Sequence, residues 1–353
     1  MTNFDAKESN ILITGGAGYI GSHVVKQLLE KSKSRITIID NLSTGSQKNL
    51  DTLFDISEGR LTFIKADLKD FEYVNEIFIK HRFDTVIHFA ASIVVPESVE
   101  NPIKYYMNNT VNTTNLIKSS VEHGVGKFIF SSTAAVYGEP KNLPDDGIDE
   151  EYPTSPINPY GMSKLMSERV LIDTAMANSS FKYVILRYFN VAGADANDEN
   201  SSCSIPSPRI GQSFPNATHL IKIAAECAVG KRSKMFIFGD DYPTPDGTGI
   251  RDYIHVDDLA YAHVKAIEYL DSNESDIFNV GYGKGYSVKD VISTMKRVTN
   301  KDFIVKLAPR RLGDPAKLIA NNRKIKRKMN WYPKYEDLEF ICKTAYEWEK
   351  KLG

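Results

Sequence analysis

Short apolar runs alternate with longer amphipathic stretches through the first half of the chain. The runs are rich in β-branched side chains, which is typical of strands that are buried on both faces of a parallel sheet. They lie at residues 10–14, 35–40, 61–66, 84–90, 127–132 and 183–189. Between them the spacing of apolar residues predicts helices over 19–32, 70–81, 101–123 and 159–178. This alternation predicts an α/β fold with a doubly wound parallel sheet, whose ligand lies at the carboxyl ends of the strands.

Beyond residue 190 the alternation breaks down. Residues 194–217 are polar and rich in Ser, Pro and Asn, which predicts a long loop that enters a second lobe. Shorter elements follow, namely an apolar stretch at 235–239 and helices near 256–271 and 335–351. The second lobe is therefore expected to be a smaller α/β unit.

The length of 353 residues allows two domains. We expect the first over 1–189, with a contribution from about 235–262, and the second over 190–353. The densest positive cluster, at 323–328, is interpreted as a solvated helix face rather than a binding patch.

Charge and composition exclude several classes of function. Lys and Arg number 44 against 45 Asp and Glu, so no bulk positive charge favours nucleic acid or an anionic membrane. The N-terminal residues hold no apolar signal core and no later stretch is long enough to span a membrane, so we expect a cytoplasmic protein. The thiols are expected to be buried or idle, and no metal site is expected from the histidine spacing. These residues are Cys203, Cys227 and Cys342, and His88, His255 and His263.

A glycine-rich turn follows the first predicted strand. The sequence TGGAGYIGS contains G-x-G-x-x-G at Gly16, Gly18 and Gly21, and Gly15 extends it. Glycines permit a tight turn and close approach of the backbone to a pyrophosphate, while the N-terminus of the following helix offers N–H groups to phosphate. Asp40 ends the second strand, where a carboxylate binds the adenosine ribose hydroxyls and repels a 2′-phosphate. The pattern predicts a site that prefers NAD to NADP.

Two alternatives stay open at this turn. A glycine-rich connection can join a strand to a helix without binding a nucleotide. Asp67, which follows the third strand, is equally suited to contact the adenine ring or to cap the helix over 70–81.

Tyr160 and Lys164 are the candidate catalytic residues. They stand four residues apart in a helix predicted to begin at Pro159, so they share one face of it. A phenol has a pKa near 10, and a base that works near neutral pH needs a shift of roughly three units, about 4 kcal/mol. The Lys164 ammonium and a positive nicotinamide ring would both favour the phenolate. A hydroxyl from Ser131, Ser132 or Thr133, at the end of the fifth strand, is suited to stabilise the sugar oxygen that loses its proton.

Taken together, the motifs resemble those of the extended short-chain dehydrogenases/reductases, and within them the UDP-glucose 4-epimerase family. The matching stretches are TGGAGYIGSH, HFAAS, YYMNN, SSTAAVYG, NPYGMSK, RYFNVAGA, GTGIRDYIHVDDLA and RRLGDPA, which span nearly the whole chain. The resemblance implies a Rossmann-type NAD domain, a UDP-sugar domain, and an isomerase that inverts C4 of a UDP-hexose through a transient 4-keto sugar. It also implies Thr133, Tyr160 and Lys164 as the catalytic set.

The resemblance places the cofactor and substrate contacts as well. Besides Gly15, Gly18 and Gly21, the positions implied for NAD are Tyr19, Ile20, Asp40, Asn41, Asp67, Leu68, Phe89, Ala90, Asn109, Lys164 and Tyr188. Arg251 and Arg311 match the arginines that hold the diphosphate, a role to which bidentate Arg is suited, and Asp314 matches a carboxylate on the uridine ribose. Further substrate positions, besides Thr133 and Tyr160, are Asn190, His219, Leu220, Phe238 and Leu318.

Two substrate positions depart from the commonest pattern of the family. Asn is commoner than His at position 219. At the position of Leu318 the family often has a bulky Tyr, associated with exclusion of N-acetylated sugars, or a small Cys or Ser, associated with their acceptance. Leucine lies between these sizes, so UDP-glucose, UDP-N-acetylglucosamine or both remain open as substrates.

Other functions fit less well. A sugar-nucleotide 4,6-dehydratase would carry an Asp-Glu pair directly after the strand-five hydroxyl, where this chain has Ala134 and Ala135. A nucleotide-sensing protein without turnover would have no need for the Tyr160 and Lys164 pair. Relatives are commonly dimers joined through helices like those over 101–123 and 159–178, so a homodimer is expected.

Overall fold

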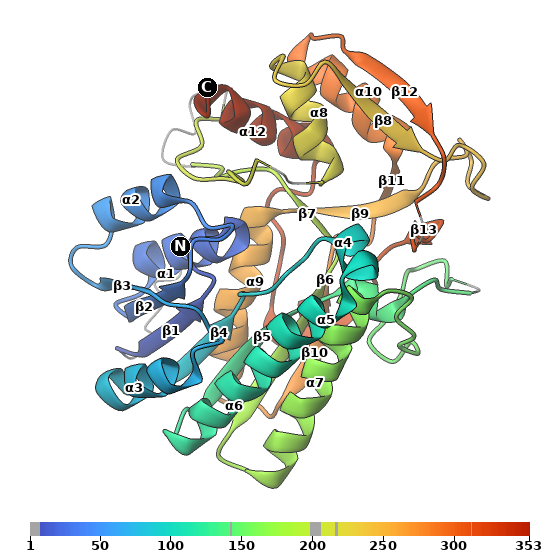
Figure 1. Cartoon of the computed structure of the whole chain (residues 1–353). Helices are drawn as coiled ribbons and strands as arrows, with labels where there is room; N and C mark the ends of the chain where they lie inside the picture. The colour runs from blue at the N-terminus through green and yellow to red at the C-terminus, as the bar shows by residue number, and fades with distance from the viewer. Residues whose placement is uncertain (1–7, 142, 198–205, 216–217, 312) are drawn as a thin grey trace.

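A seven-stranded parallel sheet is the centre of the larger lobe (Figure 1). The computed structural model describes residues 8–141, 143–197, 206–215, 218–311 and 313–353. The strand order is β10-β6-β5-β4-β1-β2-β3, and every neighbouring pair is parallel. The strands are β1 Asn10–Thr14, β2 Arg35–Asp40, β3 Leu61–Lys65, β4 Thr85–His88, β5 Lys127–Thr133, β6 Lys182–Tyr188 and β10 Asp276–Val280. The six predicted strands and the doubly wound fold are confirmed.

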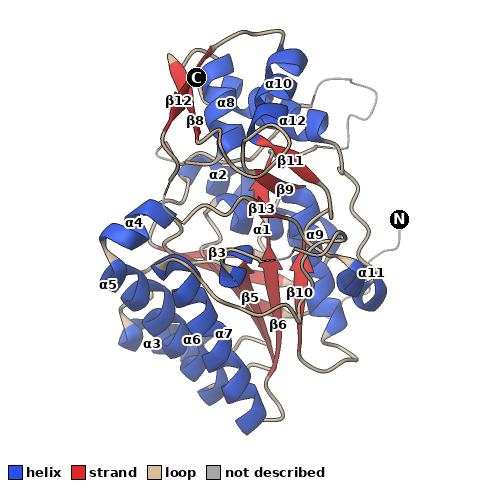
Figure 2. Ribbon diagram, turned by 90° about the vertical axis from the view of Figure 1, so that its right-hand side faces the viewer, coloured by secondary structure: helices blue, strands red, loops and turns tan. Residues whose placement is uncertain are grey.

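Helices cover both faces of this sheet (Figure 2). One face is covered by α1 Tyr19–Lys31, α2 Gln47–Asp55 and α9 Val256–Tyr269. The other is covered by α3 Phe71–His81, α6 Asn112–Glu122 and α7 Pro159–Ala177. Three short elements precede α6, namely α4 Val95–Glu100, α5 Pro102–Tyr105 and a π-helix, Tyr106–Val111.

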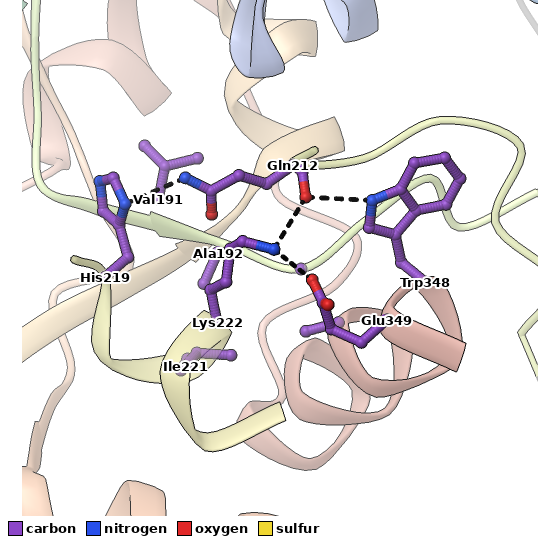
Figure 3. A pocket seen from close by; sticks show the side chains of 10 residues that line it. Val191, Ala192, Gln212, His219, Ile221, Lys222, Trp348 and Glu349 are labelled. Atoms are coloured by element: carbon purple, nitrogen blue, oxygen red, sulfur yellow. Dashed lines mark hydrogen bonds and ion pairs between the residues drawn. The ribbon is translucent and has the colours of Figure 1, made fainter. Parts of the chain in front are cut away.

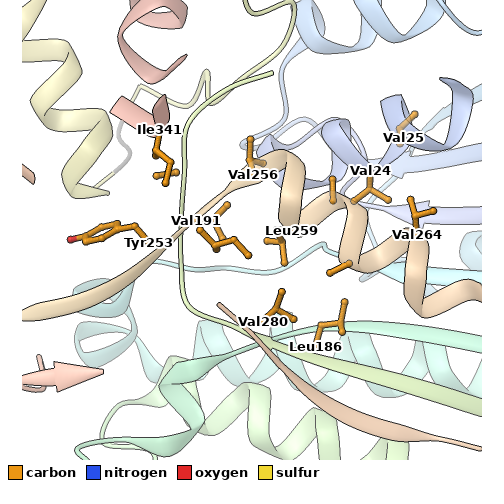
Figure 4. Close-up of a cluster of buried hydrophobic side chains, with 14 of the residues drawn as sticks. Val24, Val25, Leu186, Val191, Tyr253, Val256, Leu259, Val264, Val280 and Ile341 are labelled. Carbon is orange, nitrogen blue, oxygen red and sulfur yellow. The ribbon is translucent and has the colours of Figure 1, made fainter. Parts of the chain in front are cut away.

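Alternate residues of each strand belong to two separate hydrophobic cores, because successive side chains of a strand point to opposite faces. Ile11, Ile13 and Ile129 belong to the core beneath α1 and α9. Leu12 and Phe130 belong to the core beneath α3, α6 and α7. The first core is continuous from α1 through α9 into the smaller lobe (Figure 4). Continuous apolar strands in the sequence are therefore explained by burial on both sides of the sheet.

The helix predicted over 101–123 is interrupted. It is divided into α5, the π-helix and α6, and the π-helix carries the buried Asn109. The side-chain amide of Asn109 donates to the Ser92 carbonyl and to the Ser163 hydroxyl, both at 3.0 Å. Because π-helical turns commonly occur at functional sites, the interruption indicates a functional site at this end of the sheet.

The smaller lobe lies beyond the carboxyl ends of the large sheet (Figure 1). It holds a four-stranded sheet of β7 Asn190–Ala192, β9 Ile250–His255, β11 Gly285–Ser287 and β13 Lys317–Leu318. It also holds the parallel pair β8 Lys234–Phe238 and β12 Ile304–Ala308, with the helices α8 Leu220–Ala228, α10 Val288–Thr299 and α12 Leu338–Lys351. Helix α11 Arg323–Met329 packs on β10 and α9 of the large lobe.

The chain passes between the two lobes more than once. After β9 in the small sheet, α9 packs on α1 and β10 becomes the edge strand of the large sheet. The large sheet thus takes residues 276–280, beyond the segment of about 235–262 that we expected to join it. The division into domains at residue 190 stays a prediction. The loop predicted over 194–217 lies partly outside the described residues.

The positive run and the cysteines lie on different parts of the structure. The positive run at 323–328 belongs to α11, and Lys324 and Lys328 both form ion pairs with Asp276, at 2.5 and 2.6 Å. Cys227 and Cys342 are buried free thiols, as expected, and Cys203 lies outside the described residues. Within the described residues, no helix is long and apolar enough to cross a membrane, and no cluster of His, Cys, Asp and Glu could hold a metal ion.

A buried ionic network joins the two lobes where the chain crosses between them. Lys26 of α1 contacts Asp195 at 2.5 Å and Asp257 of α9 at 3.0 Å, and all three side chains are buried. Arg209 also pairs with Asp195, at 2.7 Å. Burial alone would lower the pKa of Lys26, but the two carboxylates overcome that effect and hold the pKa above its usual value. The network fixes the helix after the glycine turn against the entry to the small lobe.

We expect Lys26→Met to lower the free energy of unfolding by about 3–5 kcal/mol, because the Asp195 and Asp257 carboxylates would lose their shared buried cation. Chemical denaturation followed by circular dichroism measures this change. Lys350→Met is the matched control, since Lys350 pairs with Glu347 at the surface and such pairs contribute about 0–1 kcal/mol. Equal losses in the two variants would contradict the importance of the network.

Candidate active site

The glycine turn between β1 and α1 requires glycine at two positions. Gly15 has φ +74°, and a Cβ there would lie 2.7 Å from the backbone nitrogen of Ala90. A Cβ at Gly21 would lie 2.3 Å from the Gly15 carbonyl oxygen. Gly18 is the N-cap of α1 and provides no side-chain cap to its first N–H groups. The turn therefore leaves backbone N–H groups at the start of a helix, which is the arrangement that binds phosphate.

This turn lies where the strand order reverses direction. The chain places β2 and β3 on one side of β1 and β4, β5 and β6 on the other. Ligands of open α/β sheets bind at this switch point, outside the carboxyl ends of the strands. Phe89 and Ala90 follow β4 and lie against the turn, since the backbone nitrogen of Phe89 donates to the Thr14 carbonyl at 2.9 Å. The residues present at the switch point fit a dinucleotide.

Asp40 lies beside the glycine turn at the end of β2. Its carboxylate accepts the backbone N–H of Ala17 at 3.1 Å and that of Leu42 at 2.8 Å. Burial raises the pKa of Asp40, and these two N–H groups partly offset the rise. Each carboxylate oxygen retains capacity for a second hydrogen bond, which agrees with a contact to ribose hydroxyls.

Asp67 does not cap a helix. The N-cap of α3 is Asp70, whose carboxylate accepts the N–H of Tyr73, so the capping interpretation of Asp67 is wrong. Asp67 instead accepts a hydrogen bond from the Asn41 amide at 3.0 Å. Burial acts to raise the pKa of Asp67, but the Lys69 N–H and the Asn41 amide bring it below its usual value. The pair Asn41 and Asp67 thus lies beyond Asp40 at the same edge of the sheet, and the buried Leu68 follows it.

Tyr160, Lys164 and Thr133 lie together at the carboxyl end of β5. The helix α7 begins at Pro159, and the Asn158 side chain caps it by accepting the Gly161 N–H at 2.8 Å. Tyr160 and Lys164 are both buried, and the Lys164 ammonium donates to the Ser131 carbonyl at 2.8 Å. Thr133, the last residue of β5, lies near enough to the Tyr160 phenol to lower its pKa. The sequence-predicted catalytic residues are therefore adjacent.

Burial shifts the pKa values of Tyr160 and Lys164 in a way that the sequence did not indicate. It raises the pKa of Tyr160, and the hydrogen bond with Thr133 lowers that pKa by a smaller amount. It lowers the pKa of Lys164 to about 7, against the opposing effect of Glu168. The sequence led us to expect a lowered pKa for Tyr160 beside Lys164 and a bound nicotinamide. In the chain by itself burial is the main cause of the shift, and the pKa of Tyr160 is raised.

The surroundings of Tyr160 include residues that the sequence prediction missed. His263, from α9, lies 4.8 Å from the Phe89 ring and 6.3 Å from the Tyr188 ring, measured between ring centroids. Its Nδ1 hydrogen-bonds to the Leu259 carbonyl at 2.9 Å, which makes that nitrogen the donor. Its Nε2 therefore accepts the hydrogen bond from the Ser131 hydroxyl at 3.1 Å. Burial and the neighbouring Tyr160 raise the pKa of Tyr188, so both phenols are protonated at neutral pH.

The predicted substrate residues lie across several elements of the small lobe. Asn190 begins β7, Phe238 ends β8, and Arg251 lies on β9 directly opposite Leu318 of β13. The Arg311 guanidinium stacks over the Phe238 ring at 3.7 Å from the ring centroid. Both arginines are half-buried and Asp314 is exposed. Arg251 and Asp314 have opposite effects on the pKa of Tyr253, so they lie near the same phenol.

His219 lies at the N-cap of α8, beside a small pocket (Figure 3). The Gln212 amide donates to His219 Nδ1 at 3.0 Å, so the imidazole proton is on Nε2. Burial, together with the charge of Lys222, lowers the pKa of His219. An uncharged His219 is thus a neutral hydrogen-bond donor beside Leu220, like the Asn that is commoner there.

Leu318 is buried next to the catalytic strand end. It belongs to a hydrophobic cluster with Ala134, Val136 and Phe189. Ala134 directly follows Thr133, so the cluster connects Leu318 with the hydroxyl beside Tyr160. A side chain at position 318 can therefore affect the space available to a sugar at this site.

Fold and site together define a dinucleotide-binding Rossmann-type protein with a buried Tyr-Lys pair. Residues 11–281 match the model of the NAD dependent epimerase/dehydratase family. The chain belongs to this family, which confirms the recognition made from the sequence, and its cofactor is NAD.

Characterised relatives are similar over nearly their full length. A UDP-glucose 4-epimerase of Azospirillum brasilense is 45% identical over 100% of this chain and 95% of its own. The structure of the UDP-Glc/GlcNAc 4-epimerase of Campylobacter jejuni shares 56% identity, with a TM-score of 0.82, and covers 97% of this chain and 99% of that one. A UDP-glucose 4-epimerase of Bifidobacterium longum, solved in complex with NAD+ and UDP, has a TM-score of 0.89 at 37% identity, covering 97% of this chain and 98% of that one.

Proposed function

We propose that this enzyme inverts the configuration at C4 of a UDP-hexose through a transient 4-keto sugar, with Tyr160 as general base. The observation that carries the proposal is the adjacency of Tyr160, Lys164 and Thr133 at the sheet edge that also holds the glycine turn. The similar proteins named as UDP-glucose 4-epimerases, over nearly the full chain, support the same reaction.

The cofactor site is proposed at the switch point of the large sheet. Gly15, Gly18 and Gly21 allow the pyrophosphate to approach the backbone, and Asp40 accepts hydrogen bonds from the adenosine ribose. Lys164 is proposed to hold the nicotinamide ribose. When bound, NAD supplies a reversible acceptor for the C4 hydride. The remaining candidate contacts, from Asn41 and Asp67 to Tyr188, line the same edge of the sheet.

Tyr160, brought to the phenolate by the positive charge that a bound NAD would add beside it, is proposed to remove the proton of the 4-hydroxyl. Thr133 is proposed to donate a hydrogen bond to the oxygen that becomes negative. Arg251 and Arg311 hold the diphosphate, so the sugar can turn about its phosphate link and present its other face. Tyr160 then returns the proton to the new 4-hydroxyl. Since the reaction causes no net oxidation, the cofactor has no need to leave between turnovers.

A dehydratase is disfavoured by the residues that follow Thr133. Elimination of water needs an acid and a base beside the 4-keto sugar, and the positions for them are held by Ala134 and Ala135. Ala134 packs in the cluster with Leu318 and cannot carry a proton. Epimerisation needs neither group, so it is the reaction that this site supports best.

Replacing Tyr160 by Phe is expected to lower kcat about 100- to 1000-fold, the usual effect of losing a general base. Binding of NAD and of UDP should persist, because the phenol oxygen alone is removed. Conversion of UDP-galactose, followed by NMR, measures the loss, and titration calorimetry with UDP checks binding. Tyr183→Phe is the control, since Tyr183 lies near the opposite end of β6. Unchanged turnover in the Tyr160→Phe enzyme would refute the assignment.

We further propose that the sugar pocket accepts both plain and N-acetylated UDP-hexoses. Leu318 is smaller than Tyr, and it packs in a cluster with Ala134 and Phe189. The Campylobacter jejuni relative, named as a UDP-Glc/GlcNAc 4-epimerase, supports this range.

The variant Leu318→Tyr is expected to reduce kcat/KM for UDP-N-acetylgalactosamine about tenfold relative to that for UDP-galactose, because the ring fills the space for the acetyl group. Parallel assays of the two sugars give the ratio. Leu307→Tyr, on the exposed strand β12, should leave it unchanged. An unaltered ratio in Leu318→Tyr would show that position 318 does not select the sugar.

We also propose a homodimer that buries the face formed by α4, α5, the π-helix and α7. Large apolar side chains are exposed on this face, with Ile103 at 68% and Met107 at 54% of their surface accessible, together with Val99 and Met166. Soluble proteins commonly bury a contiguous apolar patch of this kind against a partner. In a symmetric dimer, one interface would cover this patch on both subunits.

The double variant Ile103→Glu with Met107→Glu is expected to be monomeric, since two buried carboxylates per subunit would oppose association. Size-exclusion chromatography with light scattering measures the mass of both proteins. Ile304→Glu changes an equally exposed apolar residue on β12 and should leave the dimer intact. A wild-type protein that is monomeric at micromolar concentration would overturn the proposal.

A further inference from the structure

We propose that Asp252 is a positioning residue that fixes β13 and the turn after β10 against β9, and thereby sets the shape of the sugar pocket. The inference rests on the substrate-binding roles proposed above for Arg251 and Leu318. It concerns a residue that contacts neither the sugar nor the cofactor in the proposed mechanism.

The Asp252 carboxylate accepts three backbone hydrogen bonds from two separate segments. One oxygen, Oδ1, accepts the N–H of Tyr282 at 2.9 Å. The other, Oδ2, accepts the N–H of Gly283 at 2.8 Å and that of Ala320 at 3.2 Å. The side chain is fully buried. All three donors lie outside the strands, since β10 ends at Val280 and β13 ends at Leu318.

The strand β13 needs such an anchor because it is only two residues long. It pairs with β9 through Lys317 opposite Ile250 and Leu318 opposite Arg251. A strand this short forms few ladder hydrogen bonds, so its position depends on the residues that follow it. A single bridge between Ile148 and Ala320 holds its other side. The Asp252 carboxylate supplies a further attachment, at Ala320.

Asp252 acts from the face of β9 opposite to the substrate arginine. Successive side chains of a strand alternate in direction, so Asp252 points away from Arg251 and Tyr253. Its carboxylate therefore holds the backbone after Leu318 while Arg251 remains directed to the other face. A displacement of Ala320 would move Leu318, which lies two residues earlier and packs beside Ala134.

The close packing around the carboxylate supports a geometric role. A Cβ added at Gly281 would lie 2.6 Å from Asp252 Oδ2 and 2.7 Å from the Ala320 Cβ. Burial raises the pKa of Asp252 to about 6, although the three N–H groups act to lower it. Asparagine has the same shape but only one acceptor oxygen, and its NH2 group would face a backbone N–H. The position therefore favours a group with two acceptor oxygens.

The test is the variant Asp252→Asn, assayed with UDP-galactose and UDP-N-acetylgalactosamine. We expect KM for UDP-galactose to rise about tenfold with kcat changed less than about threefold, because the loss affects binding geometry and leaves Tyr160 in place. The ratio of kcat/KM between the two sugars should shift by at least about threefold. The content of bound NAD should match that of the wild type.

A matched control separates this effect from general destabilisation. Asp258 is also a buried carboxylate, and it accepts two backbone N–H groups, from Lys334 and Tyr335. It also accepts the Tyr282 hydroxyl at 2.6 Å, but none of its hydrogen bonds in the described chain reaches β13 or Ala320. Asp258→Asn should lower stability and leave KM and the sugar ratio unchanged. Gly281→Ala, which displaces the Asp252 carboxylate, should reproduce the pattern of Asp252→Asn. An equal effect of Asp252→Asn and Asp258→Asn on KM, or no effect of Asp252→Asn, would overturn the inference.

Hydrogen exchange of the wild-type protein tests the inference without depending on the folding of any variant. The amides of Tyr282, Gly283 and Ala320 are expected to exchange slowly with deuterium, as amides of a strand do, although they lie outside the strands. Exchange as fast as that of an exposed loop would overturn the inference. An inactive wild type with slow amides would instead refute the proposed function, so the two failures are distinguishable.

Discussion

The burial of Tyr160 and Lys164 at the carboxyl end of β5 is the constraint on which the site depends. Desolvation disfavours both charges, so it raises the pKa of the phenol and lowers that of the ammonium to about 7. The chain therefore holds the pair close to neutral. In such a site a positive charge beside the phenol has a large effect on the pKa of the phenol, because little solvent screens the charge. The same burial that opposes the phenolate makes the site responsive to its ligand.

The parallel arrangement of the strands brings the other parts of the site to the same edge of the sheet. Parallel strands end at one edge, so the glycine turn after β1, Asp40 at the end of β2, Phe89 after β4 and Thr133 at the end of β5 all lie there. The small lobe is fixed over this edge because α9 and β10 return from it to the large sheet. Lys26, with its two carboxylates, binds the crossing segments together at the glycine-turn helix. Cofactor and substrate sites are thus held by one continuous structure.

Local patterns in the sequence predicted the features that depend on local physics. Burial on both faces makes a strand continuously apolar, and the tight turn against Ala90 requires glycine at position 15. The strands and the glycine turn could therefore be predicted from the sequence. Helix α10 was also readable from the capping box of Ser287 and Asp290, and it was missed. The π-helix around Asn109 and the contact of His263 with Ser131 depend on segments far apart in the chain. The upward shift of the Tyr160 pKa in the chain by itself was not predicted, because burial is a tertiary property that residue spacing does not show.

In the proposed site, selectivity for the sugar depends on where the side chain at position 318 lies as well as on its size. A comparison of residue types at position 318 considers only size, and Leu is intermediate by that measure. In the proposed site, however, the Leu318 side chain stands on a strand of two residues, so its location depends on what holds that strand. In this chain the anchors are the bridge to Ile148 and the carboxylate of Asp252. Two relatives with the same residue at this position can therefore differ in substrate range, because the backbone that carries it need not lie in the same place.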